Sequence, residues 1–207
     1  MEFPRIIHAI WIGPKPAPRK LLDTWAALNP KWEFRLHISD RGWRNQRQID
    51  LMPELNGKAD IMRFELLAKH GGVYVDADEE CLQPLDALDQ RFLEHESWCC
   101  WENETCRPGM MATTVLGARP GSRLFNELVN RVPTCNLKVA AWECVGPAFL
   151  TRIGKHHRET HVFPARHFLP EHYTGTPAPG DAPIFGRHHW GNTQAVLTRA
   201  DIYGKFV

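Results

Sequence analysis

The decisive stretch of the sequence lies at residues 58–80 and reads KADIMRFELLAKHGGVYVDADEE. Apolar residues recur in its first half at the spacing of one helix face: Ile61, Phe64, Leu67 and Ala68. The pair Gly71-Gly72 then ends the predicted helix, because a left-handed cap costs glycine little. The stretch therefore predicts a helix over about residues 58–70 and a sharp stop after it.

The second half of the stretch predicts a buried strand at residues 73–75, followed at once by an acidic run. Asp76 and Asp78 leave the carboxyl end of this strand. Ligands of open α/β sheets bind beyond the carboxyl ends of the strands. This placement makes the acidic pair a candidate site.

The residues before this stretch predict the start of an α/β sheet. A β-branched strand is expected at residues 6–12, a proline-rich loop after it, a helix at 20–28 and a second strand at 33–38. A strand–helix–strand order of this kind is typical of a parallel sheet with flanking helices. We therefore predict an α/β fold with a mostly parallel central sheet, in one domain over residues 1–207.

Later elements are predicted from weaker patterns. The expected order is a strand near 98–101, another near 113–116, a helix at 122–131, a loop at 146–147, an irregular crossing at 174–183 and a short strand or turn at 183–186.

Composition narrows the class of protein. The chain is 43% hydrophobic and 24% charged with a formal net charge of +1, which is typical of a folded protein and not of a non-specific nucleic-acid binder. No apolar run is long enough to span a membrane, and the first residues do not resemble a secretory signal. The six cysteines form no Cys-x-x-Cys pair. We expect a cytoplasmic protein with reduced thiols and no structural zinc.

Asp76 and Asp78 are candidate ligands of a divalent cation. Carboxylate oxygens suit Mg²⁺ or Mn²⁺, which can bridge the phosphates of a nucleotide-sugar and neutralise charge on the departing diphosphate. A bare Asp-x-Asp is more often a solvated turn. The buried strand and the glycine stop before this pair favour the metal site.

Four further residues can take part in such a site. Asp60 and Arg63 share a helix face, either as a surface ion pair or as a group that binds sugar and phosphate oxygens. Trp11, at the end of the first strand, is either a core residue or a platform for a nucleobase. His188, in a His-His-Trp run near the C-terminus, is either a surface histidine or a distant metal ligand.

Together these motifs resemble glycosyltransferase family 32, which includes yeast-type mannosyltransferases, capsular sugar transferases and relatives of clostridial glucosylating toxins. The resemblance rests on Phe3–Gly13, on Trp25 with Asn29–Phe34, on Lys58–Leu67 and above all on Gly71–Asp78. It is good over about residues 4–86 and returns at Gly146-Pro147 and at His188–Trp190.

The resemblance implies a GT-A fold, a Mn²⁺-dependent reaction, a nucleotide-sugar donor that we expect to be UDP-linked, and retention of anomeric configuration. It also implies residue roles. Trp11 would stack on the base, Asp60 and Arg63 would hold sugar and phosphates, and the donor would lie along Asp76, Ala77 and Asp78. Asp76, Asp78 and His188 would bind the metal, with Asp78 and Arg63 the main catalytic residues and His188 preferred to His189.

The sequence departs from the family in two places. Relatives carry Ser-Trp where this chain has Thr193-Gln194, and an expected Asn near residues 110–112 is missing. Two alternatives therefore stay open. One is a sugar-nucleotide or glycan-binding module without turnover. The other is a phosphatase with an Asp-x-Asp motif, although Glu80 stands where such enzymes need Thr or Val. The acceptor hydroxyl is left open among a glycan, a lipid-linked sugar, a protein and a modified base.

Overall fold

The computed structural model describes residues 3–88 and 90–191. Their strands are β1 (Ile6–Ile10), β2 (Glu33–His37), β3 (Gly72–Val75), β4 (Glu79–Cys81), β5 (Ser97–Asn103), β6 (Arg107–Met111), β7 (Val115–Ala118), β8 (Thr160–Phe163) and β9 (Gly186–His188). The α-helices are α1 (Arg19–Leu28), α2 (Gln46–Leu51), α3 (Leu55–His70), α4 (Arg123–Arg131), α5 (Ala141–Cys144) and α6 (Pro147–Gly154).

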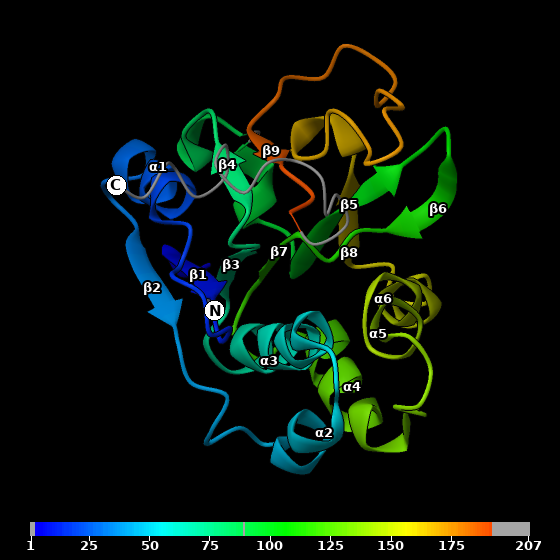
Figure 1. Cartoon of the computed structure of the whole chain (residues 1–207). Coiled ribbons are helices and arrows are strands. Elements are labelled where there is room, and N and C mark those ends of the chain that lie inside the picture. The colour runs from blue at the N-terminus through cyan, green and yellow to red at the C-terminus, as the bar shows by residue number, and fades with distance from the viewer. Residues whose placement is uncertain (1–2, 89, 192–207) are drawn as a thin grey trace.

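The central sheet has the order β2-β1-β3-β7-β5-β6, and β8 also pairs with β5 (Figure 1). β1 runs parallel to β2 and β3, while β7 runs antiparallel to both β3 and β5. β8 is parallel to β5, and β6 is antiparallel to it. Five strands therefore share one direction and β7 and β6 oppose them, which confirms the predicted α/β fold with a mostly parallel sheet.

Two apolar clusters cover the two faces of this sheet. One joins Tyr74 and Leu116 to helices α3, α4 and α6, and the other joins Val73 and Val75 to α1. The neighbours in β3 fall into different clusters because side chains alternate along a strand. In Figure 1, α2 to α6 accordingly gather on one side of the sheet and α1 on the other.

A small second sheet brings the end of the described chain back to β3. β4 follows the Asp76–Asp78 turn and pairs antiparallel with β9, so that Glu79 lies opposite His188. The indole of Trp25 donates to the Glu79 carbonyl oxygen at 2.8 Å and so ties β4 to α1. This long-range pairing places the C-terminal histidines beside the acidic turn.

Several predicted boundaries were wrong. The third helix begins at Leu55 and not at residue 58, and α2 before it was not predicted. The segment at 146–147 begins α6, because proline is tolerated at the first position of a helix. The last strand covers 186–188, three residues beyond the predicted start, since its pairing with β4 and not its own composition defines it. No helix among the described residues is both long and apolar enough to cross a bilayer.

Candidate active site

A cavity of about 460 Å³ opens at the carboxyl end of β3. Its lining includes every position that the sequence proposed for a site: Trp11, Asp60, Arg63, Asp76, Ala77, Asp78 and His188. These residues come from the segment directly after β1, from α3, from the β3–β4 turn and from β9. The fold therefore brings together side chains that lie up to most of the chain length apart in sequence.

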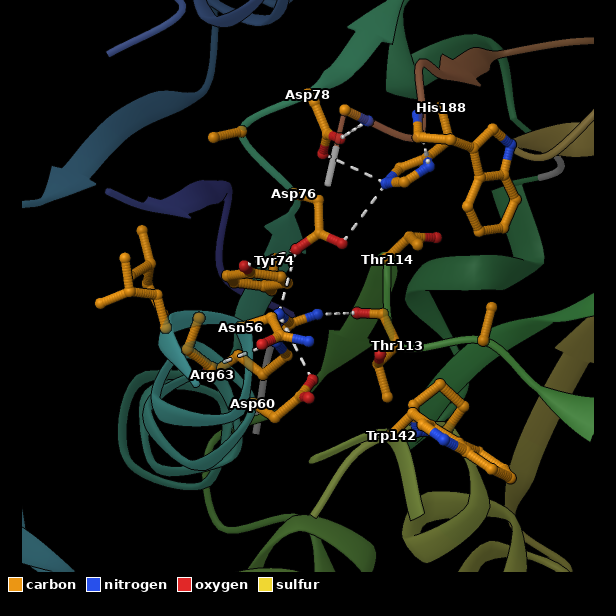
Figure 2. Close-up of a pocket in the computed structure, with 18 of the residues that line it drawn as sticks. Asn56, Asp60, Arg63, Tyr74, Asp76, Asp78, Thr113, Thr114, Trp142 and His188 are labelled. Carbon is orange, nitrogen blue, oxygen red and sulfur yellow. Dashed lines mark hydrogen bonds and ion pairs between the residues drawn. The ribbon is translucent and has the colours of Figure 1, made fainter. Parts of the chain in front are cut away.

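Asp76, Asp78 and His188 point toward one another (Figure 2). One ligand atom from each lies within 4.8 Å of the others. His188 Nε2 is 3.1 Å from Asp78 Oδ1 and 3.6 Å from Asp76 Oδ2. Two adjacent ligands of an octahedral ion with bonds of about 2.1 Å lie about 3.0 Å apart, so this spacing fits a Mg²⁺- or Mn²⁺-sized cation. The donor set fits it too, because hard carboxylate oxygens and one imidazole suit Mn²⁺.

The electrostatics of this group are those of a site that holds positive charge. Burial alone raises the pKa of Asp78, but the charge of His188 and the N–H group of Gly191 outweigh it and hold that pKa well below its usual value. Burial lowers the pKa of His188, yet Asp78 and Asp76 raise it well above the ordinary histidine value. The carboxylates of Asp76 and Asp78 thus stabilise positive charge at this position, where a bound cation would be attracted.

Arg63 is buried below the acidic pair and ties the site to the sheet. Its Nη2 lies 3.1 Å from Asp76 Oδ1 and 3.3 Å from Asp60 Oδ1, and its Nη1 donates to the Thr113 carbonyl oxygen at 2.6 Å. The guanidinium also lies 4.4 Å from the ring centre of Tyr74, whose hydroxyl donates to Asp76 Oδ1 at 2.8 Å. Most donors of Arg63 are therefore directed at protein oxygens, and the side chain orients Asp76.

Asp60 is a buried residue of the cavity lining, and burial raises its pKa to about 7 although Arg63 acts in the opposite direction. The neighbouring Gly146 leaves room for it, since a Cβ at that position would meet Asp60 Oδ2 at 3.0 Å. Asp60 can accept a hydrogen bond when ionised and donate one when protonated, as a site for sugar hydroxyls requires.

Trp11 and Ala77 belong to the cavity wall as well. The indole N–H of Trp11 donates to the Lys15 carbonyl oxygen at 2.6 Å, so the ring is fixed at the end of β1 while staying partly exposed. Trp11 thus combines an anchored edge with an accessible surface, which is compatible with stacking on a planar base.

The two C-terminal histidines separate as the sequence analysis preferred. His188 faces Asp76 and Asp78, whereas His189 Nε2 lies 3.0 Å from Glu80 Oε2.

Of the two departures from the family pattern, Thr193-Gln194 lies outside the described residues. Near residues 110–112 the cavity is lined by Ala112, followed by Thr113 and Thr114.

Sequence reasoning missed another part of the lining. Glu102, Arg107, Trp142, Tyr173 and Trp190 face the same cavity, as does Asn56 at the start of α3. Apart from Trp190, which ends the His188–Trp190 run, none of them stands in a recognisable motif, and they come from separate segments of the chain. Only their position around one cavity in the folded chain marks them as a group.

Trp190 is the one non-glycine residue of the described chain with positive φ, at 52°. Its N–H donates to His188 Nδ1 at 3.2 Å, and the next residue, Gly191, donates to Asp78 Oδ2 at 2.8 Å. A bulky residue in the left-handed region is strained and persists where its surroundings impose it. Here the surroundings are the acidic turn itself.

The fold and this site together define a class. In a comparison of structures, the chain resembles PaToxG glycosyltransferase with a TM-score of 0.59 and 15% identity, over 76% of this chain and 70% of that one. It also resembles the galactosyltransferase LgtC in complex with donor and acceptor sugar analogs, with a TM-score of 0.58 and 12% identity, over 96% and 92%. Likeness at such low identity establishes the fold. The chain has the GT-A glycosyltransferase fold.

The sequence comparisons agree with the resemblance to glycosyltransferase family 32. Residues 31–97 match the glycosyltransferase sugar-binding region containing a DXD motif. Inositol phosphoceramide mannosyltransferase 3 of Schizosaccharomyces pombe is 27% identical over 142 residues, which cover 63% of this chain and 37% of that protein. Both matches confirm the predicted resemblance to family 32. It spans little more than a third of that mannosyltransferase.

Proposed function

We propose that this chain is a glycosyltransferase that moves a sugar from a UDP-linked donor to an acceptor hydroxyl, with the help of a divalent cation and with retention of anomeric configuration. One observation carries the proposal. Asp76, Asp78 and His188 converge within 4.8 Å in a cavity that also contains Trp11 and Arg63. A cation site beside an aromatic platform is what a nucleoside diphosphate requires.

Each residue has a distinct task in this reaction. Asp76, Asp78 and His188 would hold Mn²⁺, which when bound supplies Lewis-acid stabilisation of the leaving diphosphate. Arg63 keeps Asp76 in place and adds positive charge to the same end of the cavity. Trp11 would stack on the base, and Asp60 would bind hydroxyls of the donor sugar. Ala77, the small residue between the two aspartates, leaves room for the donor.

Retention can follow from a front-face path. In that path the acceptor hydroxyl attacks from the side of the departing phosphate, and a phosphate oxygen takes the hydroxyl proton. Positive charge then grows on the sugar while negative charge grows on the diphosphate. Proton NMR of the first product tests this path by showing its anomeric configuration. A product with the anomeric configuration opposite to that of the donor would exclude the path.

The decisive experiment is a screen of nucleotide-sugars for Mn²⁺-dependent release of nucleoside diphosphate. UDP-glucose, UDP-galactose and UDP-N-acetylglucosamine test the preferred donor class. GDP-mannose is included because the matched relative is a mannosyltransferase. Asp78→Asn should lower the rate at least about 100-fold, because it removes the charge of a metal ligand. Asp23→Asn, an exposed carboxylate on α1, is the matched control and should change little.

The outcomes separate the alternatives. An unchanged rate in Asp78→Asn would refute the metal assignment. Tight binding of UDP and Mn²⁺ without hydrolysis or transfer would favour the binding module. Hydrolysis of a simple phosphomonoester without sugar transfer would favour the phosphatase, although the GT-A fold gives that alternative no support.

A further inference from the structure

One wall of the cavity has no task in the reaction described so far. We call Glu102, Arg107, Trp142, Tyr173 and Trp190 the second wall; all five line the cavity with the metal group. Trp11 and the start of α3 line the cavity as well, and the proposed donor occupies that part and the acidic turn. Figure 2 shows Trp142 well away from Asp78 and His188.

The second wall is continuous. Arg107 lies at its centre, with Nε 3.6 Å from Glu102 Oε1, Nη2 donating to the Tyr173 hydroxyl at 3.3 Å, and the guanidinium 5.5 Å from the ring centre of Trp142. The ring centres of Tyr173 and Trp190 are 5.4 Å apart, and those of Trp190 and His188 are 4.5 Å apart. The wall thus runs from an outer tryptophan to the predicted metal ligand.

Glu102 offers an open hydrogen-bond acceptor in this wall. The residue is only 8% exposed. Its Oε1 contacts His172 Nε2 at 3.1 Å in addition to Arg107, whereas no hydrogen bond to its Oε2 occurs within the described part of the chain. Glu102 lines the cavity, so this oxygen can accept a hydrogen bond from a ligand hydroxyl there.

The charge of the wall favours a neutral ligand. Arg107 is close to Glu102, so its positive charge is offset and little remains to attract an anion. The other members are aromatic, and Trp142 is 46% exposed. Aromatic faces pack against the C–H face of a ring while a carboxylate accepts from its hydroxyls. A hydroxylated ring presents both surfaces.

We propose that the second wall is the acceptor subsite and that it binds a neutral hydroxylated ring, a sugar or a cyclitol. The ring packs on Trp142 and Trp190, and one of its hydroxyls donates to Glu102 Oε2. A neighbouring hydroxyl then faces the metal end of the cavity. This inference rests on the proposed function, since it supplies the second substrate of the same reaction.

The test is saturation-transfer NMR of small rings on the full chain, with and without UDP and Mg²⁺. The probes are methyl α-mannoside, methyl β-galactoside and myo-inositol. At least one should bind. Its affinity should fall about 10-fold in Trp142→Ala and in Glu102→Gln, from the lost ring contact and the lost charged acceptor. Trp142→Phe should recover most of the loss, and Ile38→Ala, an exposed residue outside the cavity, should match the unmodified chain.

Several results would overturn the subsite: no probe binds, binding is equal in all variants, or mannose 6-phosphate binds more tightly than its neutral parent. The last result would indicate an anionic acceptor held by Arg107. Calorimetric titration with UDP and Mg²⁺ keeps the two proposals apart. If the rings bind with these residue dependences but UDP does not bind, the proposed function is refuted and the subsite stands. If UDP binds but no ring does, the subsite is refuted and the proposed function stands.

Discussion

Among single residues, Arg63 decides the geometry of the candidate site. Its guanidinium is buried between Asp60 and Asp76, and both carboxylates depend on it. Removing one partner of a buried ion pair leaves the other charge without compensation. We predict that Arg63→Met lowers the free energy of unfolding by about 3–5 kcal/mol, measured by urea denaturation.

Arg35→Met provides the matched comparison for Arg63. Arg35 also pairs with a carboxylate, Glu33, but both side chains are substantially exposed. Exposed ion pairs are screened by solvent, so this variant should shift the urea midpoint far less. Equal shifts in the two variants would mean that burial of the Arg63 group does not govern its contribution.

For single elements, the close approach of β1 and β3 is the critical contact. Gly72 begins β3 with φ of 87°, and a Cβ there would lie 2.5 Å from the carbonyl oxygen of Ile6 in β1. This contact aligns β1, which Trp11 follows, with β3, which Asp76 follows. Only glycine permits both the left-handed backbone and the short distance.

Gly72→Ala should therefore lower the free energy of unfolding by about 2–4 kcal/mol, from left-handed strain together with overpacking. Gly175 separates the two causes. It has φ of 80°, but nothing lies within 4 Å of an added Cβ. Gly175→Ala should cost only about 1 kcal/mol. If thermal or urea unfolding gave the same loss for both, the steric explanation for Gly72 would be wrong.

At the scale of the whole molecule, a buried histidine couples stability to pH. His8 donates through Nε2 to the Gly71 carbonyl oxygen at 3.1 Å, so its Nδ1 accepts from His37 Nε2 at 3.0 Å. Burial lowers the pKa of His8 to about 3, and the nearby His37 acts in the same direction. Protonation would place two N–H groups against each other and disturb the junction of β1, β2 and α3.

The sign of the pH effect follows from this lowered pKa. Between pH 6.5 and about 3 the unfolded chain binds a proton at His8 that the folded chain does not, so the contribution is complete above pH 6.5 and is lost on acidification. From pH 7.5 to pH 5.0 the contribution of His8 to the free energy of unfolding should fall by about 2 kcal/mol. Urea titrations at both pH values give the change in the free energy of unfolding between them. This change should be smaller by about 2 kcal/mol in His8→Gln than in the unmodified chain. An unchanged pH dependence in that variant would assign the effect to other groups.

The sequence by itself determined the strand–helix–strand start of the fold, the helix before Gly71 and the acidic turn, but not α2. The helix that ends at Gly71, the buried strand after it and the Asp76–Asp78 pair are local patterns, because periodicity, a glycine stop and a short apolar run act within a few residues. Asp60 and Arg63 could be placed on one face for the same reason. That they are buried and not a surface pair was not determined, since burial depends on what packs over the helix.

Only the tertiary structure decided the rest of the site. His188 reaches Asp78 because β9 pairs with β4, two short strands that are stable only against each other and the surrounding core. The second wall joins Glu102 and Arg107 of neighbouring strands to Trp142, Tyr173 and Trp190 from distant loops and a short helix. Such groups carry no local signal, because their members are positioned by strand pairing and side-chain packing between segments far apart in the chain, and not by the residues next to them.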